Sequence, residues 1–428
     1  MNSSQTIFVC SSCGEEYLRW QGRCDNCGAW NTLKEFKTAA KTFKSVLPRS
    51  EVVELDKIKI TNFKRISTKM GEFDRVLGGG IVPGSVILLG GDPGIGKSTL
   101  ILQITQGIEN ILYVSGEESI GQIKMRFDRL GLKVKTLKFF TEIDLGQIFL
   151  AIEKEKPQAV VIDSIQTVYS GDFPSTPGSI VQVRECALKL QQLAKTTETP
   201  VILVGHVTKE GTVAGPRTLE HLVDVVLYLE GERFHQNRIL RGVKNRFGAT
   251  DEIGIFEMTE KGLLEVANPS KLFLEERLKD VPGTVVTASI EGSRALLVEI
   301  QALTTTTVFG YPQRRVSGFD LNRLQLIIAV LQKRAGLNLG NQDVFINVTG
   351  GIKVKEPAVD LAVALAIASS FRGKPIDPRF CVFGELGLSG EIRKVSLENK
   401  RQAEARRLGF TNFIKEKTIS QVLRSCNV

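Results

Sequence analysis

The octapeptide Gly91-Asp92-Pro93-Gly94-Ile95-Gly96-Lys97-Ser98 follows an apolar run, Val86-Ile87-Leu88-Leu89. It matches the pattern G-x-x-x-x-G-K-[ST], whose glycines let successive backbone N–H groups converge on phosphate oxygens. A helix-forming stretch continues through Thr99, so the positive end of its dipole also points at the phosphates. The pattern predicts a nucleotide phosphate-binding loop. Lys97 would neutralise the β- and γ-phosphates of ATP, and the Ser98 hydroxyl would bind Mg²⁺.

Short apolar runs like the one before this loop recur at residues 111–114, 159–162 and 201–204, separated by segments of helix length. Continuous apolar strands that alternate with helices predict a mostly parallel sheet with helices on both faces. Two more runs, at 225–229 and 238–243, flank a polar turn and predict antiparallel strands at one edge. We therefore expect an α/β domain over residues 65–268.

Polar residues follow the predicted strands where a bound nucleotide would lie. Asp163 ends the third strand, and its carboxylate is expected to hold Mg²⁺ through water. Glu117 and Glu118 follow the second strand, and we favour Glu117 as the base that activates the attacking water. The alternative is that these glutamates cap the next helix. His206 follows the fourth strand and is expected either to sense the γ-phosphate or to serve in the core or a cap.

Four of the seven cysteines lie together near the start of the chain, in the pattern C-x₂-C-x₁₀-C-x₂-C. Two such pairs predict a structural tetrahedral zinc site in a finger over residues 1–30. The four ligands would be Cys10, Cys13, Cys24 and Cys27. The other three cysteines are scattered, which is typical of a reduced chain. Residues 31–64, rich in Lys, Thr and Ser, are expected to form a linker.

The positive charge is concentrated in the last third of the chain. The net charge is +9, and residues 271–428 hold 23 Lys and Arg against 15 Asp and Glu, a difference of +8. This excess indicates either a solvated basic surface or a polyanion-binding face. Apolar strands at 283–287 and 295–300 followed by helices at 322–335 and 359–369 predict a separate α+β domain over residues 269–428.

The order of the nucleotide-binding motifs resembles the RecA/DnaB superfamily of oligomeric ATPases. The motif Lys244-Asn245-Arg246-Phe247-Gly248 resembles the KNRFG signature of the bacterial RadA (Sms) family of DNA repair ATPases. The stretches Gly205-His206-Val207-Thr208-Lys209-Glu210-Gly211 and Gly215-Pro216-Arg217-Thr218-Leu219-Glu220-His221 resemble the same family. The resemblance covers almost the whole chain.

This resemblance implies a role for the basic pair Lys244 and Arg246, which stand two apart at the end of a predicted strand and so point to one face. In ring ATPases like DnaB, such a pair reaches the ATP of the neighbouring subunit and stabilises charge in the transition state. A solvated basic pair is the alternative. A trans-acting pair implies a homo-oligomeric ring, with a hexamer as the expected size.

The resemblance also implies which loops would face DNA. In RecA-type rings, the loops after the third and fourth strands line the central channel. Here these loops are expected at residues 170–184 and 209–217, with Arg184, Lys209 and Arg217 as candidate phosphate contacts.

Residues from about 335 to 413 resemble the proteolytic domain of Lon, a peptidase with a Ser/Lys dyad. The resemblance rests on Gly350-Gly351, Glu356 to Ala362, Gly384 to Gly390 and Arg406 to Phe410. The position of the serine holds Ala358, and Asn399 stands where the lysine is expected, next to Lys400. Without a nucleophile, covalent acyl transfer has no first step, so we expect no protease activity.

Taken with the resemblance, these features predict a cytoplasmic DNA-dependent ATPase, a ring-shaped translocase that drives branch migration in DNA repair and recombination. ATP, Mg²⁺ and Zn²⁺ are the expected cofactors. Single-stranded and branched DNA and a recombinase filament are the expected partners, with no membrane. An ATP-dependent Lon-type protease and a non-motor RecA-fold regulatory ATPase are the competing hypotheses.

Overall fold

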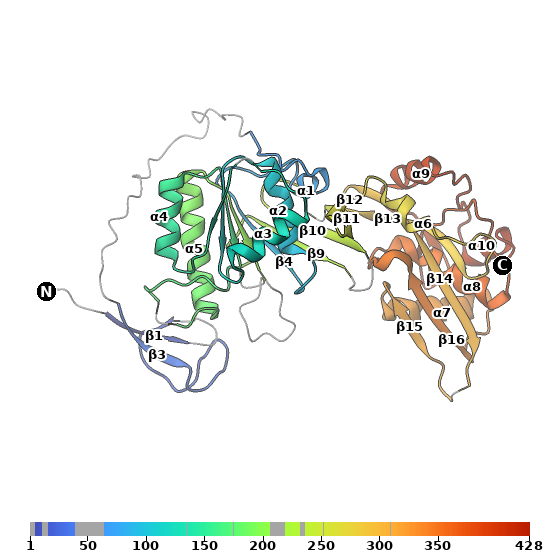
Figure 1. The fold of residues 1–428 in the computed structure, drawn as a ribbon. Helices are drawn as coiled ribbons and strands as arrows, with labels where there is room; N and C mark the ends of the chain where they lie inside the picture. The colour runs from blue at the N-terminus through green and yellow to red at the C-terminus, as the bar shows by residue number, and fades with distance from the viewer. Residues whose placement is uncertain are drawn as a thin grey trace, which may run out of the picture. The chain divides into compact units, whose positions relative to one another are not determined.

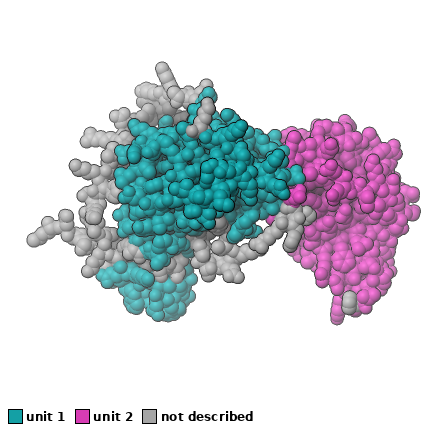
Figure 2. Space-filling model, in the orientation of Figure 1, with its two compact units in different colours: residues 1–230, 238–265 teal, residues 231–237, 266–428 magenta. Residues whose placement is uncertain are grey.

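The computed structural model describes residues 5–10, 16–38, 64–134, 136–173, 175–205, 219–231, 236–250, 252–308 and 310–428. These residues fall into two compact units, coloured separately in Figure 2. The first contains residues 1–230 and 238–265, and the second contains residues 231–237 and 266–428. Among the described residues, no helix is long and apolar enough to cross a membrane.

A nine-stranded sheet forms the centre of the first unit, in the order β12-β11-β10-β9-β4-β8-β7-β5-β6 (Figure 1). Six neighbouring strands are parallel: β9 (Val225–Glu230), β4 (Val86–Gly91), β8 (Val201–Val204), β7 (Ala159–Asp163), β5 (Ile111–Ser115) and β6 (Leu137–Phe140). Strand β10 (Asn237–Asn245) runs antiparallel to β9. Strands β11 (Ile253–Thr259) and β12 (Gly262–Glu265) form an antiparallel pair at the edge.

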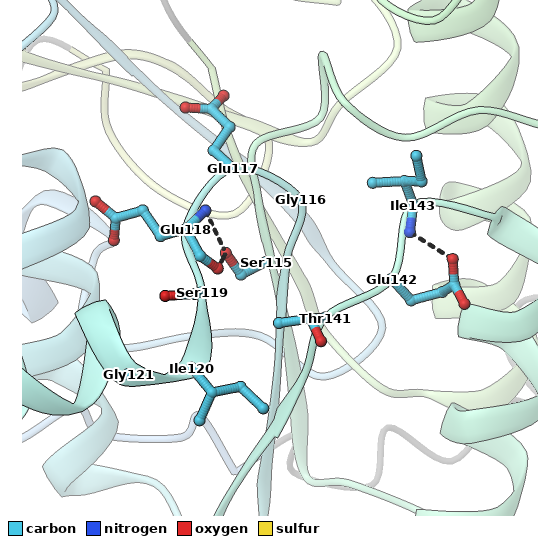
Figure 3. Close-up of a pocket in the computed structure, with 10 residues that line it drawn as sticks. All are labelled: Ser115, Gly116, Glu117, Glu118, Ser119, Ile120, Gly121, Thr141, Glu142 and Ile143. Atoms are coloured by element: carbon cyan, nitrogen blue, oxygen red, sulfur yellow. Dashed lines mark hydrogen bonds between the residues drawn. The ribbon is translucent and has the colours of Figure 1, made fainter.

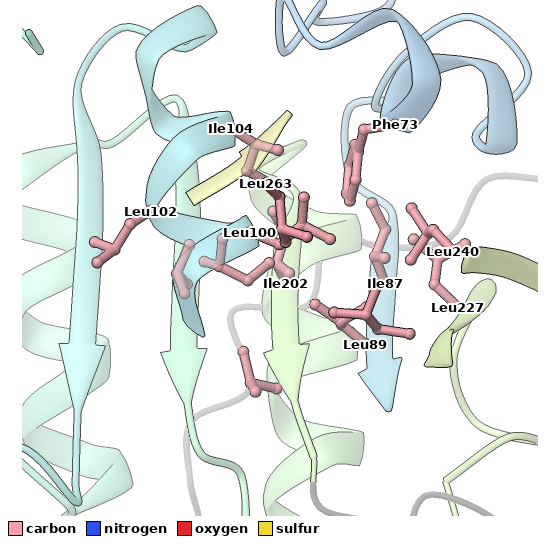
Figure 4. Close-up of a cluster of buried hydrophobic side chains, with 14 of the residues drawn as sticks. Phe73, Ile87, Leu89, Leu100, Leu102, Ile104, Ile202, Leu227, Leu240 and Leu263 are labelled. Atoms are coloured by element: carbon pink, nitrogen blue, oxygen red, sulfur yellow. The ribbon is translucent and has the colours of Figure 1, made fainter. Parts of the chain in front are cut away.

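Alternation along β4 explains why both faces of this sheet are covered. Ile87 and Leu89 belong to one buried apolar cluster, and Val86 and Leu88 belong to another. The first cluster includes residues of α1 (Gly71–Val76), α2 (Lys97–Ile104) and α3 (Ile120–Arg129), and Figure 4 shows part of it. The second includes residues of α4 (Leu145–Glu155) and α5 (Ile180–Thr197), which lie side by side in Figure 1. The predicted α/β fold with helices on both faces is confirmed.

Three details of this unit differ from the sequence-based prediction. Strand β9 pairs antiparallel with β10 as expected, but it is parallel to β4 and so extends the parallel sheet. Strand β6 was not predicted, because its side chains are only partly buried and it has no continuous apolar run. The predicted loop at 170–184 ends earlier, since Ser179 caps α5 by accepting a hydrogen bond from the Gln182 N–H.

The N-terminal segment forms a small antiparallel sheet in the order β2-β1-β3. Its strands are β1 (Gln5–Cys10), β2 (Glu16–Tyr17) and β3 (Leu33–Thr38). Strand β3 pairs with β1 along its whole length, with Leu33 opposite Cys10. The sheet therefore includes residues that the sequence assigned to the linker, because buried Leu33 packs with Cys10 and Cys24.

The second unit has a four-stranded sheet in the order β13-β14-β16-β15. The strands are β13 (Thr284–Glu291), β14 (Arg294–Thr306), β15 (Arg314–Ser317) and β16 (Gln342–Val348), and a two-stranded sheet pairs β17 (Glu385–Leu386) with β18 (Ile392–Arg393). The helices are α6 (Pro269–Leu274), α7 (Leu321–Ala335), α8 (Asp360–Arg372), α9 (Glu398–Arg407) and α10 (Ile419–Ser425). The predicted α+β composition of this region is confirmed.

Candidate functional site

The phosphate-binding loop lies between the C-terminal end of strand β4 and the start of helix α2. Three of its glycines have positive φ, namely Gly91 at 151°, Gly94 at 77° and Gly96 at 115°. A Cβ on Gly91 would lie 2.6 Å from the Leu229 carbonyl oxygen, and one on Gly96 would lie 2.6 Å from the Met258 side chain. The β9 backbone therefore leaves no room for a side chain at Gly91, and the positive φ of Gly96 disfavours one there.

Lys97 begins α2, and its side chain folds back over the loop. Its Nζ donates hydrogen bonds to the carbonyl oxygens of Gly91 (2.8 Å) and Asp92 (3.0 Å). The residue is only 4% exposed. Burial lowers the pKa of Lys97, and the carboxylates of Asp163, Asp92 and Glu117 oppose that change. The ammonium group is held among loop carbonyl oxygens and acidic side chains. Phosphate oxygens of a bound nucleotide could replace these carbonyl oxygens as its hydrogen-bond acceptors.

Asp163 ends β7 beside the start of α2, where it meets Ser98. Burial raises the pKa of Asp163, and hydrogen bonds from the hydroxyl groups of Tyr113 and Ser98 oppose this. The Tyr113 hydroxyl donates to Asp163 Oδ2 at 2.5 Å. A hydroxyl and a carboxylate in contact offer the oxygen ligands that Mg²⁺ prefers, so the residues present fit the expected ion. Tyr113, which orients this carboxylate, was missed because it reads as one apolar residue of β5.

The two glutamates after β5 have different surroundings, and Figure 3 shows their carboxyl groups pointing apart. Glu117 accepts a hydrogen bond from the Ser164 hydroxyl, next to Asp163, and its charge acts on Lys97. Glu118 instead forms a double hydrogen bond with Arg126, at 2.6 and 2.7 Å. The structure therefore places Glu117 near Ser164 and Lys97, whereas Glu118 is tied to α3.

Helix α3 is capped without either glutamate. Ser119 and Gln122 form a capping box at its N-terminus. Capping of this helix, the alternative role for Glu117 and Glu118, is therefore filled by Ser119 and Gln122. Glu117 and Glu118 also line a pocket of about 610 Å³ at the ends of β5 and β6. Its remaining lining residues are Ser115, Gly116, Ser119, Ile120, Gly121, Thr141, Glu142 and Ile143.

A buried arginine that the sequence did not single out braces the phosphate-binding loop. Arg238, at the start of β10, is 7% exposed, and its Nε donates to the Ile95 carbonyl oxygen at 3.2 Å. Burial lowers its pKa. Because it lies 140 residues after the loop in sequence, only the pairing of β10 with β9 reveals its position.

Lys244 and Arg246 lie at the opposite end of the parallel strands from the loop. In the sheet register, Gly91 stands beside Leu229, whereas Asn245 stands beside Val225. Four residue steps along β9 (229 − 225) correspond to roughly 13 Å at about 3.3 Å per residue. The loop extends further still beyond Gly91. The basic pair therefore lies far from the phosphate-binding loop of its own chain.

Both side chains of the basic pair contact the segment before β9. Lys244 Nζ donates to the Glu220 carbonyl oxygen at 2.7 Å. Arg246 Nη1 donates to Asp224 Oδ1 at 3.0 Å, and the Arg246 side chain is 49% exposed. Burial, followed by the charge of Arg246, lowers the pKa of Lys244.

The cysteine cluster has the geometry of a metal site. The sulfur atoms of Cys10, Cys24 and Cys27 lie within 4.8 Å of one another, and those of Cys10 and Cys27 are 3.7 Å apart. Tetrahedral zinc with Zn–S bonds of about 2.3 Å needs sulfurs about 3.8 Å apart, so the three residues fit such an ion. Cys13 lies outside the described residues.

The candidate DNA contacts are only partly described. His206, Lys209 and Arg217 lie outside the described residues. Arg184 is on the first turns of α5 and not on a loop, because buried Val183, Cys186 and Ala187 give this stretch a helical apolar stripe. Its side chain is exposed.

The Lon-like region holds no nucleophile at the position where the protease has one. Ala358 is 1% exposed, and Asn399 and Lys400 are exposed on α9. Residues close in sequence to these positions form an ion pair. Glu356 pairs with Arg401, which is fully buried and also donates to the Ala288 carbonyl oxygen. This ion pair joins the segment before α8 to α9 and β13.

Fold and site together define a P-loop ATPase domain with a mostly parallel sheet, preceded by a metal-binding ribbon and followed by an α+β domain. Three family models match these parts. They are a rubredoxin metal binding domain at residues 8–35, an AAA domain at 53–212 and subunit ChlI of Mg-chelatase at 299–418.

Whole-chain comparison gives the family. The chain is 52% identical over 425 residues to "DNA repair protein RadA" of Bacillus subtilis. This match covers 97% of this chain and 93% of the relative. It is also 52% identical to the protein of that name from Listeria monocytogenes, over 95% of this chain and 90% of the relative. The chain belongs to the RadA family, as its KNRFG motif predicted. A KaiC-like protein from Pyrococcus horikoshii matches 48% of this chain and 99% of its own, at 20% identity and a TM-score of 0.39.

Proposed function

We propose that this protein is a cytoplasmic DNA-dependent ATPase that works as a ring, most simply a hexamer, and drives branch migration of recombination intermediates during DNA repair. The name of its relatives supports the repair role. Its own residues support the ATPase activity, through the contacts among Lys97, Ser98, Asp163 and Glu117. The expected substrate is ATP, and the expected tracks are single-stranded and branched DNA, with a recombinase filament as a further partner.

In the proposed reaction, backbone N–H groups of the loop and Lys97 hold the β- and γ-phosphates. Ser98 and Asp163 hold Mg²⁺, which supplies charge neutralisation when bound, and Tyr113 keeps the Asp163 carboxylate turned towards Ser98. Glu117, held by Ser164, positions the attacking water and accepts its proton. His206 is proposed to sense the γ-phosphate.

One observation carries the ring proposal: Lys244 and Arg246 lie at the edge of the sheet away from their own loop. A half-exposed guanidinium at that edge is available to a second subunit. Acting in trans, it would stabilise charge on the phosphates of a neighbour's ATP. Neither residue can do this in an isolated chain, so hydrolysis by this arrangement requires an oligomer.

DNA is expected to raise the ATPase rate several-fold, because the nucleic acid would bring neighbouring subunits together around the track. Arg184 and the undescribed Lys209 and Arg217 remain the proposed phosphate contacts, together with the basic C-terminal region. The test is the hydrolysis rate with and without single-stranded DNA, with Lys97→Ala as the control for contaminating ATPases. An unchanged rate at DNA concentrations that saturate binding would contradict the proposal.

The ribbon is expected to hold one tightly bound Zn²⁺ per chain through Cys10, Cys13, Cys24 and Cys27. Elemental analysis of protein purified without chelator should find zinc, and Cys24→Ser should lower its content, because Cys24 is a fully buried ligand. The free cysteine Cys186 lies elsewhere and is buried, so Cys186→Ser is a matched control that should leave the zinc content unchanged. Iron in place of zinc, or no metal, would refute the assignment.

The Lon-like domain is expected to cut no peptide bond, since Ala358 offers no nucleophile. Incubation with casein and ATP should yield no new peptides. ATP-dependent degradation that persists in the wild-type protein after removal of contaminating proteases would contradict this expectation. The domain is proposed instead to bind DNA or to assemble the ring.

A further inference from the structure

The chain has only two tryptophans, and both lie exposed on the metal-binding ribbon. Trp20 is 58% exposed and Trp30 is 70% exposed. Indole rings are mostly buried in folded proteins, because their large apolar faces gain free energy when they leave water. Neither ring contributes much to the ribbon's own core, which is formed by Cys10, Cys24 and Leu33. Their exposure therefore suggests a surface that is completed by a ligand.

The two rings share one small surface. Atoms of both indoles come within 3.9 Å of the point where a Cβ on Gly22 would stand. The backbone that carries Trp30 is firmly held, since the Cys24 N–H donates to the Ala29 carbonyl oxygen at 2.9 Å and the Asn31 N–H donates to the Gly22 carbonyl oxygen at 2.7 Å. A ligand would thus meet a platform whose backbone is already ordered, which lowers the entropic cost of binding.

Positive charge lies beside this platform. Arg23 pairs with Trp30 in an antiparallel bridge, and its guanidinium lies 5.9 Å from the centre of the Trp30 ring. Its Nε donates to the Gly28 carbonyl oxygen at 3.2 Å, which fixes the direction of the side chain. Arg23 and Arg19 are both exposed. Flat aromatic faces flanked by exposed arginines are the combination with which proteins bind single-stranded nucleic acid.

We propose that Trp20 and Trp30 form a stacking platform for the bases of single-stranded DNA, with Arg23 contacting the phosphate backbone. This proposal rests on the proposed function, in which DNA is the track. It gives the ribbon a direct role in holding an unpaired strand. Stacking tolerates any sequence because every base has a π-face, so the platform should have little sequence preference.

The chain supplies its own reporter for this contact. Because both tryptophans lie on the platform, all tryptophan emission of the full-length protein comes from it. Titration with an oligothymidylate should quench this emission. The quench should reach saturation at the same DNA concentration as the fluorescence anisotropy of a dye-labelled copy of the oligonucleotide. Trp30→Leu should weaken binding by about 5-fold or more, the size expected for loss of one base–aromatic stack.

Matched variants separate stacking from apolar contact and from misfolding. Trp30→Phe keeps a π-face and should bind DNA nearly as well as the wild type, whereas Trp30→Leu keeps apolar area alone. Leu18, 77% exposed on the same ribbon, provides a control, and Leu18→Ala should leave affinity unchanged. Retention of the bound metal shows that each variant has a folded ribbon.

Two results would overturn the platform and leave the proposed function in place. One is unchanged emission while DNA binds and stimulates ATP hydrolysis. The other is equal DNA affinity of Trp30→Phe and Trp30→Leu, which would show that no base stacks on the ring at this position. Absence of DNA binding and of DNA-stimulated hydrolysis in the wild type would instead contradict the proposed function itself.

Discussion

Lys97→Ala is expected to reduce ATP hydrolysis by a factor of about 10² or more, the size seen when a charge-stabilising donor is removed from a catalytic site. The side chain contacts two carbonyl oxygens of its own loop, at Gly91 and Asp92. In the complex with ATP, its ammonium group would move to the phosphates. The measurement is the steady-state hydrolysis rate at saturating ATP and Mg²⁺.

The fold should survive this substitution. Apart from the two hydrogen bonds of Lys97, the loop is held at Gly91 and Gly96, which lie in close contact with β9 and β11. Thermal unfolding and metal content should therefore match the wild type. Lys138 provides a matched control, because it is a half-exposed lysine of the same sheet that pairs with Glu155. Lys138→Ala should hydrolyse ATP at the normal rate. Normal hydrolysis by folded Lys97→Ala would contradict the loop assignment.

Arg246→Ala is expected to lower the hydrolysis rate by on the order of 10³ while nucleotide binding changes little. The reason is that an arginine finger stabilises charge that develops mainly in the transition state. Binding is expected to persist because Arg246 lies at the edge of the sheet away from its own loop. Equilibrium binding of a fluorescent ATP analogue and steady-state hydrolysis are measured on the same preparation.

The ion pair between Arg246 and Asp224 provides the control for a merely structural role. Asp224 also accepts the Val86 N–H at 3.0 Å, so it anchors β4. Asp224→Asn keeps an oxygen for that hydrogen bond, removes the charge opposite Arg246 and leaves the guanidinium in place. We expect Asp224→Asn to hydrolyse ATP within a few-fold of the wild type. Equal losses in both variants would indicate that Arg246 acts through the stability of this edge.

The parts of the fold that were predicted correctly are those whose signal is local. The loop at 91–98 has a spacing fixed by phosphate geometry, and strands buried on both faces appear as continuous apolar runs. Strand β6 was missed because it lies at the edge of the sheet, where partial burial leaves no such run. The start of α5 was misplaced because the channel loop implied by the resemblance was extended to residue 184, whereas the cap at Ser179 begins the helix earlier.

Site residues were predicted where the type of the side chain alone indicates its chemistry. They were missed where a residue belongs to the site only because of its position in the folded sheet. Lys97, Asp163 and Glu117 carry charge after apolar strands, and the structure brings them together. Tyr113 and Arg238 act through contacts across strands, with the carboxylate of Asp163 and the carbonyl of Ile95. Strand pairing sets such contacts, and nothing in the neighbouring sequence indicates them.

Mixing Arg246→Ala with Lys97→Ala tests the central claim, that hydrolysis occurs between subunits, most directly. Each variant alone should be nearly inactive. A mixed oligomer contains interfaces that pair an intact Lys97 with an intact Arg246, so mixing should restore hydrolysis once subunit exchange has been demonstrated with labelled protein. No recovery in a mixture whose subunits have exchanged would contradict the trans-acting pair and the ring built on it.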